Sequence, residues 1–144
     1  MSARIALIHG PNLNLLGQRP ADQYGQQTLK ELETEVQAHG KELGLEVVCH
    51  QSNGEGELID LLQAAERDCA GVIFNPGGYS HTSVALRDAV EAIGIPTVEV
   101  HLSNIHARED FRRKSLTASA AKACISGLGS DGYLAALQFF HQGD

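Results

Sequence analysis

Glu99 and His101 stand two positions apart in the segment Pro96 to Arg112, which carries the most reactive side chains of this chain. The segment opens with an apolar run that predicts a buried strand over 96–101, and alternate residues of a strand project from the same face. A carboxylate beside an imidazole stabilises the protonated ring and fixes its tautomer. The spacing therefore predicts a general acid, His101, oriented by Glu99.

Arginines follow this pair closely along the chain. Arg108 and Arg112 are spaced by four residues, which would place them one turn apart on a short helix. With Arg113 they form a cationic cluster that is too small for nucleic acid but suits one carboxylate or phosphate. We therefore expect an anion clamp next to the acid.

Apolar runs and helical patterns alternate along the whole chain. The pair Thr28 and Glu31 forms a capping-box pattern that opens the first helix, and Gly44 ends it. Five alternations predict the α/β class, specifically a flavodoxin-like, five-stranded parallel sheet with helices on both faces. The expected strands are 4–9, 45–51, 71–75, 96–101 and 123–126, and the expected helices are 28–44, 55–68, 80–93 and 131–141.

Polar residues gather where three of these strands end. They lie at 9–12, at 75–78 with His81, and at 99–103. In a parallel α/β sheet, ligands bind in the crevice beyond the carboxyl ends of the strands. These three clusters should therefore converge on one site.

Composition limits the partners of the chain. Its 144 residues fit one domain, and a formal charge of −7 argues against binding to nucleic acid or to an anionic membrane surface. The cysteines (Cys49, Cys69 and Cys124) are widely spaced and form no CxxC pair, which predicts buried thiols in a reducing compartment. We therefore expect a cytoplasmic protein with no membrane span.

Several common chemistries lack their motifs. The chain has no Walker loop, and Gly78 to Thr82 does not form a nucleophile elbow. His101 and His106 lack a third metal ligand at a sensible spacing, and the lysines fall away from the strand ends, which disfavours an imine. The remaining expectation is acid–base chemistry on a small anion, with no cofactor and no metal.

A candidate base lies in the polar segment that follows the first strand, where we expect a mobile lid loop at about 18–25. Arg19 and Tyr24 share this loop. A free tyrosine titrates near pH ~10, but a neighbouring arginine stabilises the phenolate and makes it a better base. Taken alone, the pattern fits a surface tyrosine in a polar loop better.

Three motifs resemble those of the type II 3-dehydroquinate dehydratases. They are Gly10 to Gly17 (GPNLNLLG), Asn75 to Ser83 (NPGGYSHTS) and Glu99 to Glu109 (EVHLSNIHARE), in the order and at the chain length typical of that family. The resemblance implies conversion of 3-dehydroquinate to 3-dehydroshikimate. The family eliminates water in the anti sense through an enolate, without a metal or an imine.

The resemblance also implies individual catalytic roles. Tyr24 would remove the C2 proton, and Arg19 would make it a stronger base. Asn12 would stabilise the enolate oxygen through a held water. His101, oriented by Glu99, would protonate the departing C1 hydroxyl.

Further residues would bind substrate by the same resemblance. The backbone of Leu102 and Ser103 would hold the carboxylate, while Asn75, His81 and Arg112 would bind the ring hydroxyls. Asp88 would reach the site of a neighbouring subunit, because the family forms homo-oligomers, dodecamers built from trimers. Arg108 would shape the site.

The chain departs from the family motifs at two places, and two alternative functions remain open. The family loop usually carries a glutamate between the arginine and the proline, whereas here Arg19 is followed directly by Pro20, and Lys114-Ser115 replaces a commoner His-Ser. The chain could instead be a non-catalytic protein that senses a small hydroxy acid, or another lyase of the same fold. The sequence does not distinguish aromatic biosynthesis from quinate breakdown, since the chemistry is the same.

Overall fold

A five-stranded parallel sheet forms the centre of the computed structural model, which describes residues 3–18 and 26–141. The strand order is β2-β1-β3-β4-β5, which is the flavodoxin-like order. This confirms the fold class predicted from the sequence. The strands are Ala3–His9 (β1), Leu45–Gln51 (β2), Gly71–Asn75 (β3), Thr97–His101 (β4) and Ala123–Ser126 (β5).

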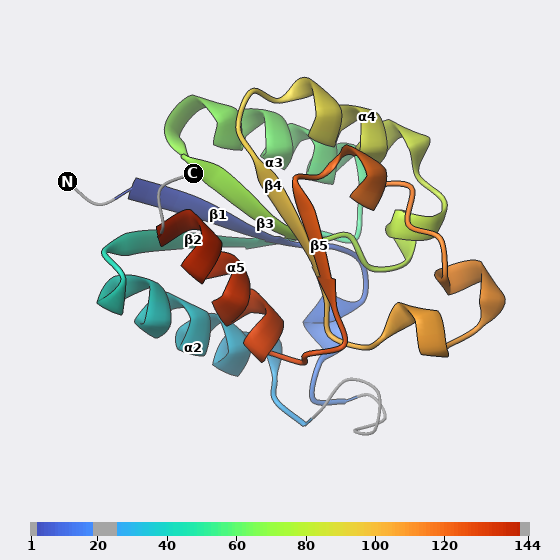
Figure 1. Cartoon of the computed structure of the whole chain (residues 1–144), viewed down its shortest axis with the longest axis horizontal. Helices are drawn as coiled ribbons and strands as arrows, with labels where there is room; N and C mark the ends of the chain where they lie inside the picture. The colour runs from blue at the N-terminus through green and yellow to red at the C-terminus, as the bar shows by residue number, and fades with distance from the viewer. Residues whose placement is uncertain (1–2, 19–25, 142–144) are drawn as a thin grey trace.

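Helices cover both faces of this sheet. Figure 1 shows α2 (Leu29–Glu42) and α5 (Asp131–His141) on one face, and α3 (Glu55–Asp68) and α4 (Val84–Ala92) on the other. Along β1, Ile5 and Leu7 pack into the core under α2 and α5, whereas Ala6 and Ile8 pack under α3 and α4. Burial of both faces explains why the strand is continuously apolar.

The first helix begins as its capping box predicts. The Thr28 hydroxyl accepts a hydrogen bond from the Glu31 amide at 3.1 Å, and the Glu31 carboxylate accepts one from the Thr28 amide at 2.9 Å. Both bonds satisfy backbone donors that have no partner within the helix. Just beyond the helix, Gly44 adopts φ +78°, a conformation that favours glycine.

The helix expected over 80–93 begins later than predicted. Residues Gly77–His81 form a separate 3₁₀ helix (η2), and α4 starts after Ser83, whose hydroxyl accepts a hydrogen bond from the Leu86 amide at 2.9 Å. Thr82 separates the two segments with ψ −21° and φ −130°. Residues 80–83 are all polar, so the apolar periodicity of α4 does not mark where the helix starts.

The polar segment after β1 is more ordered at its start than expected. Leu13–Leu15 form a short 3₁₀ helix (η1), and Leu13 and Leu16 are buried in the core under α2. Most of the expected lid loop, residues 19–25, lies outside the described residues, and with it lie Arg19 and Tyr24.

The chain between β4 and β5 consists of short 3₁₀ segments, η3 (Ile105–Ala107), η4 (Asp110–Arg112) and η5 (Ala118–Ala120). Cys124 is exposed because β5 is an edge strand, and Cys49 and Cys69 are half-buried. The prediction of buried thiols is therefore wrong for Cys124. Among the described helices, none is both long and apolar enough to cross a membrane.

Candidate active site

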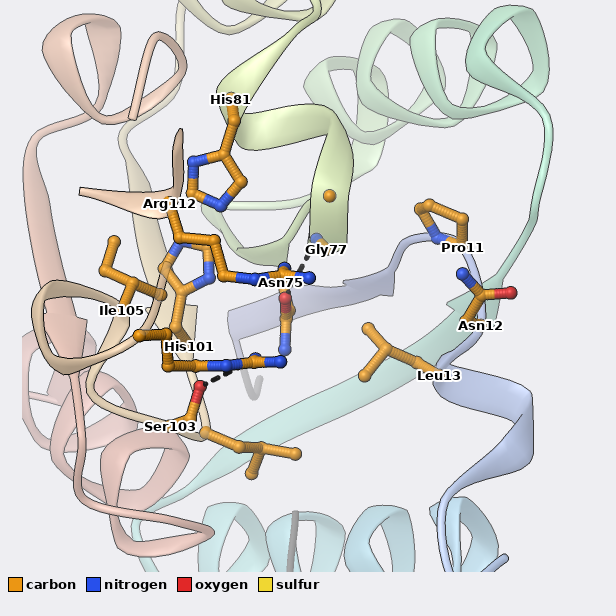
Figure 2. Close-up of a pocket in the computed structure, with 13 residues that line it drawn as sticks. Pro11, Asn12, Leu13, Asn75, Gly77, His81, His101, Ser103, Ile105 and Arg112 are labelled. Atoms are coloured by element: carbon orange, nitrogen blue, oxygen red, sulfur yellow. Dashed lines mark hydrogen bonds between the residues drawn. The ribbon is translucent and has the colours of Figure 1, made fainter. Parts of the chain in front are cut away.

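A pocket of about 150 Å³ opens beyond the carboxyl ends of β1, β3 and β4. This is the position that the strand order favours for a ligand, since the connections reverse direction between β1 and β3. Figure 2 shows the side chains converging on it from all three strand ends. Its lining residues are Pro11, Asn12, Leu13, Asn75, Gly77, Gly78, His81, His101, Leu102, Ser103, Ile105, Arg108 and Arg112.

Two turns that pack backbone against backbone form one side of the pocket. The Gly10 amide donates to the Asn75 carbonyl at 2.7 Å, and a Cβ at Gly10 would lie 2.6 Å from the Pro76 carbonyl oxygen. Gly77 adopts φ +60°. Glycine is required at both positions because a side chain would separate the turns or strain the backbone.

Asn12 enters the pocket in a left-handed conformation, with φ 71°. Asparagine tolerates this region better than most residues. The backbone N–H of Asn12 donates to the Asn53 side-chain oxygen at 3.0 Å, and the Gln51 side-chain amide donates to the Gly10 carbonyl at 3.1 Å. The end of β2 thus holds the turn that positions Asn12.

The Glu99 carboxylate lies directly behind His101. The distance between Glu99 Oε2 and His101 Nε2 is 2.6 Å, and the two residues are 1% and 5% exposed. Glu99 also accepts hydrogen bonds from the hydroxyls of Ser115, at 2.6 Å, and Thr117. This arrangement confirms the predicted pair on one strand face. With Nε2 held by Glu99, Nδ1 is the ring nitrogen of His101 that can serve a ligand.

His81 lies beside His101, with ring centroids 6.3 Å apart and planes inclined by 22° (Figure 2). Its Nδ1 donates to the Lys114 carbonyl at 2.9 Å, and its Nε2 lies 3.2 Å from the Ser80 hydroxyl. Burial lowers the pKa of His81 more than the hydrogen bond to the Lys114 carbonyl raises it, and the charges of His101 and Arg112 also lower it. The lowered pKa favours the neutral ring, which suits hydrogen bonding rather than charge pairing.

Asn75 is fixed by two hydrogen bonds at the base of the pocket. Its amide nitrogen donates to the Tyr133 hydroxyl at 2.9 Å, and its oxygen accepts from the Gly77 amide at 3.0 Å. Tyr133 is fully buried, and burial raises the pKa of its phenol well above the ordinary value. Tyr133 stays neutral, and the Gly77 N–H, which can only donate, fixes which end of the Asn75 amide carries the oxygen.

Two arginines bring positive charge to the pocket. Arg108 Nη1 lies 3.3 Å from the Ser103 hydroxyl, and Arg112 Nε donates to Glu109 at 2.8 Å. Arg112 is on η4 and Arg108 precedes it, so the prediction of one helix carrying both was wrong. Both line the pocket nevertheless, which favours an anionic ligand.

The structure brings most of the predicted site residues together. Seven line the pocket (Asn12, Asn75, His81, His101, Leu102, Ser103 and Arg112), and Glu99 supports one of them. Asp88 does not join them within this chain: it lies on α4, is exposed, and pairs with Arg87 at 3.1 Å.

Sequence reasoning missed three supporting residues, Ser115, Thr117 and Tyr133. The two hydroxyls come from the irregular segment between η4 and β5, where no periodicity indicates direction. Tyr133 reads as a core residue of an apolar helix. The role of its hydroxyl, which accepts a hydrogen bond from Asn75, is apparent only when α5 packs over β3.

Cys124 was also not expected near the site. It pairs in register with Glu99 across β4 and β5, and its sulfur lies 4.0 Å from Glu99 Oε2. Partial desolvation, together with the Glu99 charge, raises the pKa of the Cys124 thiol to about 11. The thiol is therefore protonated at neutral pH and is a poor nucleophile.

Comparison with known proteins decides the family. The model of the dehydroquinase class II family matches residues 3–141. The chain belongs to the class II dehydroquinase family. It is similar to the 3-dehydroquinate dehydratase of Pelotomaculum thermopropionicum, with 55% identity over 94% of both chains.

Solved structures agree with this membership. The type II dehydroquinase of Propionibacterium acnes superposes with a TM-score of 0.95 at 37% identity, covering 99% of this chain and 98% of that one. That of Butyrivibrio crossotus gives a TM-score of 0.93 at 39% identity, covering 96% and 97%. The class II dehydroquinase fold therefore extends over the whole described chain.

Proposed function

We propose that this class II dehydroquinase dehydrates 3-dehydroquinate to 3-dehydroshikimate by anti elimination through an enolate. The observation that carries the proposal is the buried Glu99–His101 pair at 2.6 Å, with His101 lining a pocket that also holds two arginines. A proton donor and an anion-binding surface are thus combined in one small site.

The acid step follows from the tautomer that Glu99 selects. Because the carboxylate accepts from Nε2, a protonated His101 carries its second proton on Nδ1, toward the ligand. The negative charge of Glu99 stabilises that imidazolium, and the hydroxyls of Ser115 and Thr117 hold Glu99 in place. His101 then gives its Nδ1 proton to the departing C1 hydroxyl, which leaves as water.

The base step uses the loop outside the described residues. Tyr24 takes the C2 proton, and Arg19 stabilises the phenolate. Asn12, whose backbone is held by Asn53, stabilises the enolate oxygen through a water. This assignment is supported by Leu13, which lines the pocket and precedes the loop by only a few residues of chain.

Substrate binding uses the remaining lining residues. The backbone of Leu102 and Ser103 holds the carboxylate, and Arg108 beside Ser103 adds positive charge. Asn75, whose amide is oriented by Tyr133, binds ring hydroxyls. Neutral His81 and cationic Arg112 bind the others.

A neighbouring copy completes the site in this proposal. Val84 is 59% exposed, and Asp88 lies one turn further along α4 on the same face. Asp88 is thus presented on an exposed face of α4, where it is available to another subunit, whose pocket it would reach. We propose a dodecamer built from trimers, acting in the cytoplasm.

The test is an assay with 3-dehydroquinate that follows the ultraviolet absorbance of the conjugated enone product. Turnover of 3-dehydroquinate, and of no other acid in a panel of cyclic hydroxy acids, is the expected result. Calorimetric binding of 3-dehydroquinate without product would contradict the proposal and favour a sensor. Turnover of a different acid alone would favour another lyase.

A further inference from the structure

Three potential metal ligands meet at the outer edge of the active site. The pairing of β4 with β5 places Glu99 opposite Cys124, so their side chains share one sheet face with His101. One ligand atom from each residue lies within 4.8 Å of the others, and Cys124 Sγ is 4.0 Å from Glu99 Oε2. An imidazole, a carboxylate and a thiol are thus available to one ion.

This ligand set has a definite chemical preference. Sulfur and imidazole select zinc and similar borderline-soft divalent ions over magnesium or calcium, and a thiol loses its proton outright on coordination. Three protein ligands with one open position form a common zinc geometry. Tetrahedral coordination sets the ligand atoms about 3.3–3.6 Å apart.

The present geometry is close to that requirement. The 2.6 Å contact between His101 Nε2 and Glu99 Oε2 would have to open, and the 4.0 Å separation between Glu99 and Cys124 would have to close slightly. Both of these adjustments are below about 1 Å when compared with tetrahedral spacing, and the ligand atoms of the third pair, His101 and Cys124, lie within 4.8 Å of each other. The ion would replace the proton through which His101 Nε2 hydrogen-bonds to Glu99.

Access to the cluster differs from access to the pocket. Glu99 and His101 are buried, whereas Cys124 is exposed on edge strand β5 and does not line the pocket. An ion arriving from this side would reach the Glu99–His101 pair without passing the substrate position. We propose that Glu99, His101 and Cys124 form an inhibitory site for zinc or a similar divalent ion, entered from the β5 edge.

The kinetic consequence rests on the proposed function. An ion on His101 Nε2 replaces the Glu99-supported imidazolium by a weaker acid, so water loss from the enolate slows. Because the pocket stays open, zinc should lower kcat and leave KM unchanged. A chelator should restore the rate fully.

The test uses the full-length, chelator-treated protein with zinc chloride and, separately, cobalt chloride. Wild type should lose kcat saturably with zinc, and Cys124→Val should need at least about tenfold more zinc for the same loss, relative to its own metal-free rate. Cys69→Ser is the matched control, since this half-buried thiol lies beside Asp68, away from the pocket. It should respond as wild type does.

Cobalt gives a readout that does not depend on turnover. Bound through Cys124, it should produce a thiolate-to-cobalt charge-transfer band in wild type and in Cys69→Ser but not in Cys124→Val. Equal zinc responses of wild type and Cys124→Val, or no such band with excess cobalt, would overturn the proposal. If metal-free protein fails to dehydrate 3-dehydroquinate, the proposed function fails, and the cobalt band still tests the site by itself.

Discussion

Replacing Glu99 by glutamine tests the acid step most sharply, because it removes the charge behind His101 and keeps the shape. Glu99 is 1% exposed and 2.6 Å from His101 Nε2, so little water shields the interaction. A hydrogen bond to a charged group contributes about 1.5–3 kcal/mol. At about 1.4 kcal/mol per factor of ten, losing this interaction in the acid step should lower kcat by about 10–100-fold.

Substrate affinity and stability should change much less in Glu99→Gln. Glu99 does not line the pocket, so KM should stay within about threefold, which corresponds to less than 1 kcal/mol. The Ser115 and Thr117 hydroxyls can rotate to accept from the new amide. We therefore expect a loss of about 1 kcal/mol in the free energy of unfolding, or about 3 °C in Tm.

Two rates distinguish loss of the acid from general damage. The enone absorbance gives the elimination rate, and proton NMR in deuterium oxide gives exchange at C2. Glu99→Gln should retain C2 exchange while elimination falls. Ser115→Ala, which removes one donor but keeps the Glu99 charge, should stay close to wild type in both rates. Unchanged kcat in Glu99→Gln, or an equal loss of exchange and elimination, would refute the assigned role of Glu99.

Other perturbations test separate parts of the site. Tyr24→Phe should abolish both elimination and C2 exchange while calorimetry still detects substrate binding; retained turnover would exclude Tyr24 as the base. Tyr133→Phe leaves the buried Asn75 amide without its acceptor, so it should cost about 1–3 kcal/mol of stability and raise KM, and an unchanged KM would show that Asn75 needs no such support. Gly10→Ala places a Cβ 2.6 Å from the Pro76 carbonyl and should lower stability by about 1–3 kcal/mol, measured by urea unfolding; wild-type stability would contradict the close packing of the two turns. Burial, with the Glu33 charge, raises the pKa of the Cys49 thiol to about 12, so this thiol ionises at lower pH in the unfolded chain than in the folded one. The free energy of unfolding should therefore fall as pH rises above about 9. Cys49→Ala should flatten this slope, and a slope equal to that of wild type would contradict the role of Cys49.

The sheet could be predicted from the sequence because its central strands, β1, β3 and β4, are buried on both faces. That burial gives continuous apolar runs, and the predicted bounds of β2, β3 and β5 match the structure. The start of α4 could not be predicted in this way, since residues 80–83 are all polar and carry no apolar periodicity. A break in backbone direction leaves no trace in residue spacing.

The site was predictable where function depends on neighbours in sequence. Glu99 and His101 share a strand face by a spacing of two, so their contact follows from strand geometry alone. The contacts of Glu99 with Thr117 and Cys124 span 18 and 25 residues and depend on how the chain returns as β5. No local pattern encodes that return, so the hydroxyl support and the nearby thiol emerge only from the folded chain.

The most direct test of the account is dehydration of 3-dehydroquinate by protein treated with a chelator and then with borohydride in the presence of substrate. An enolate route that uses Tyr24 and His101 needs neither a metal nor an imine, so the enone absorbance should rise at an undiminished rate after both treatments. Loss of activity with the chelator would show a required metal, and loss with borohydride would show a lysine imine. Either loss would contradict the mechanism proposed for this site.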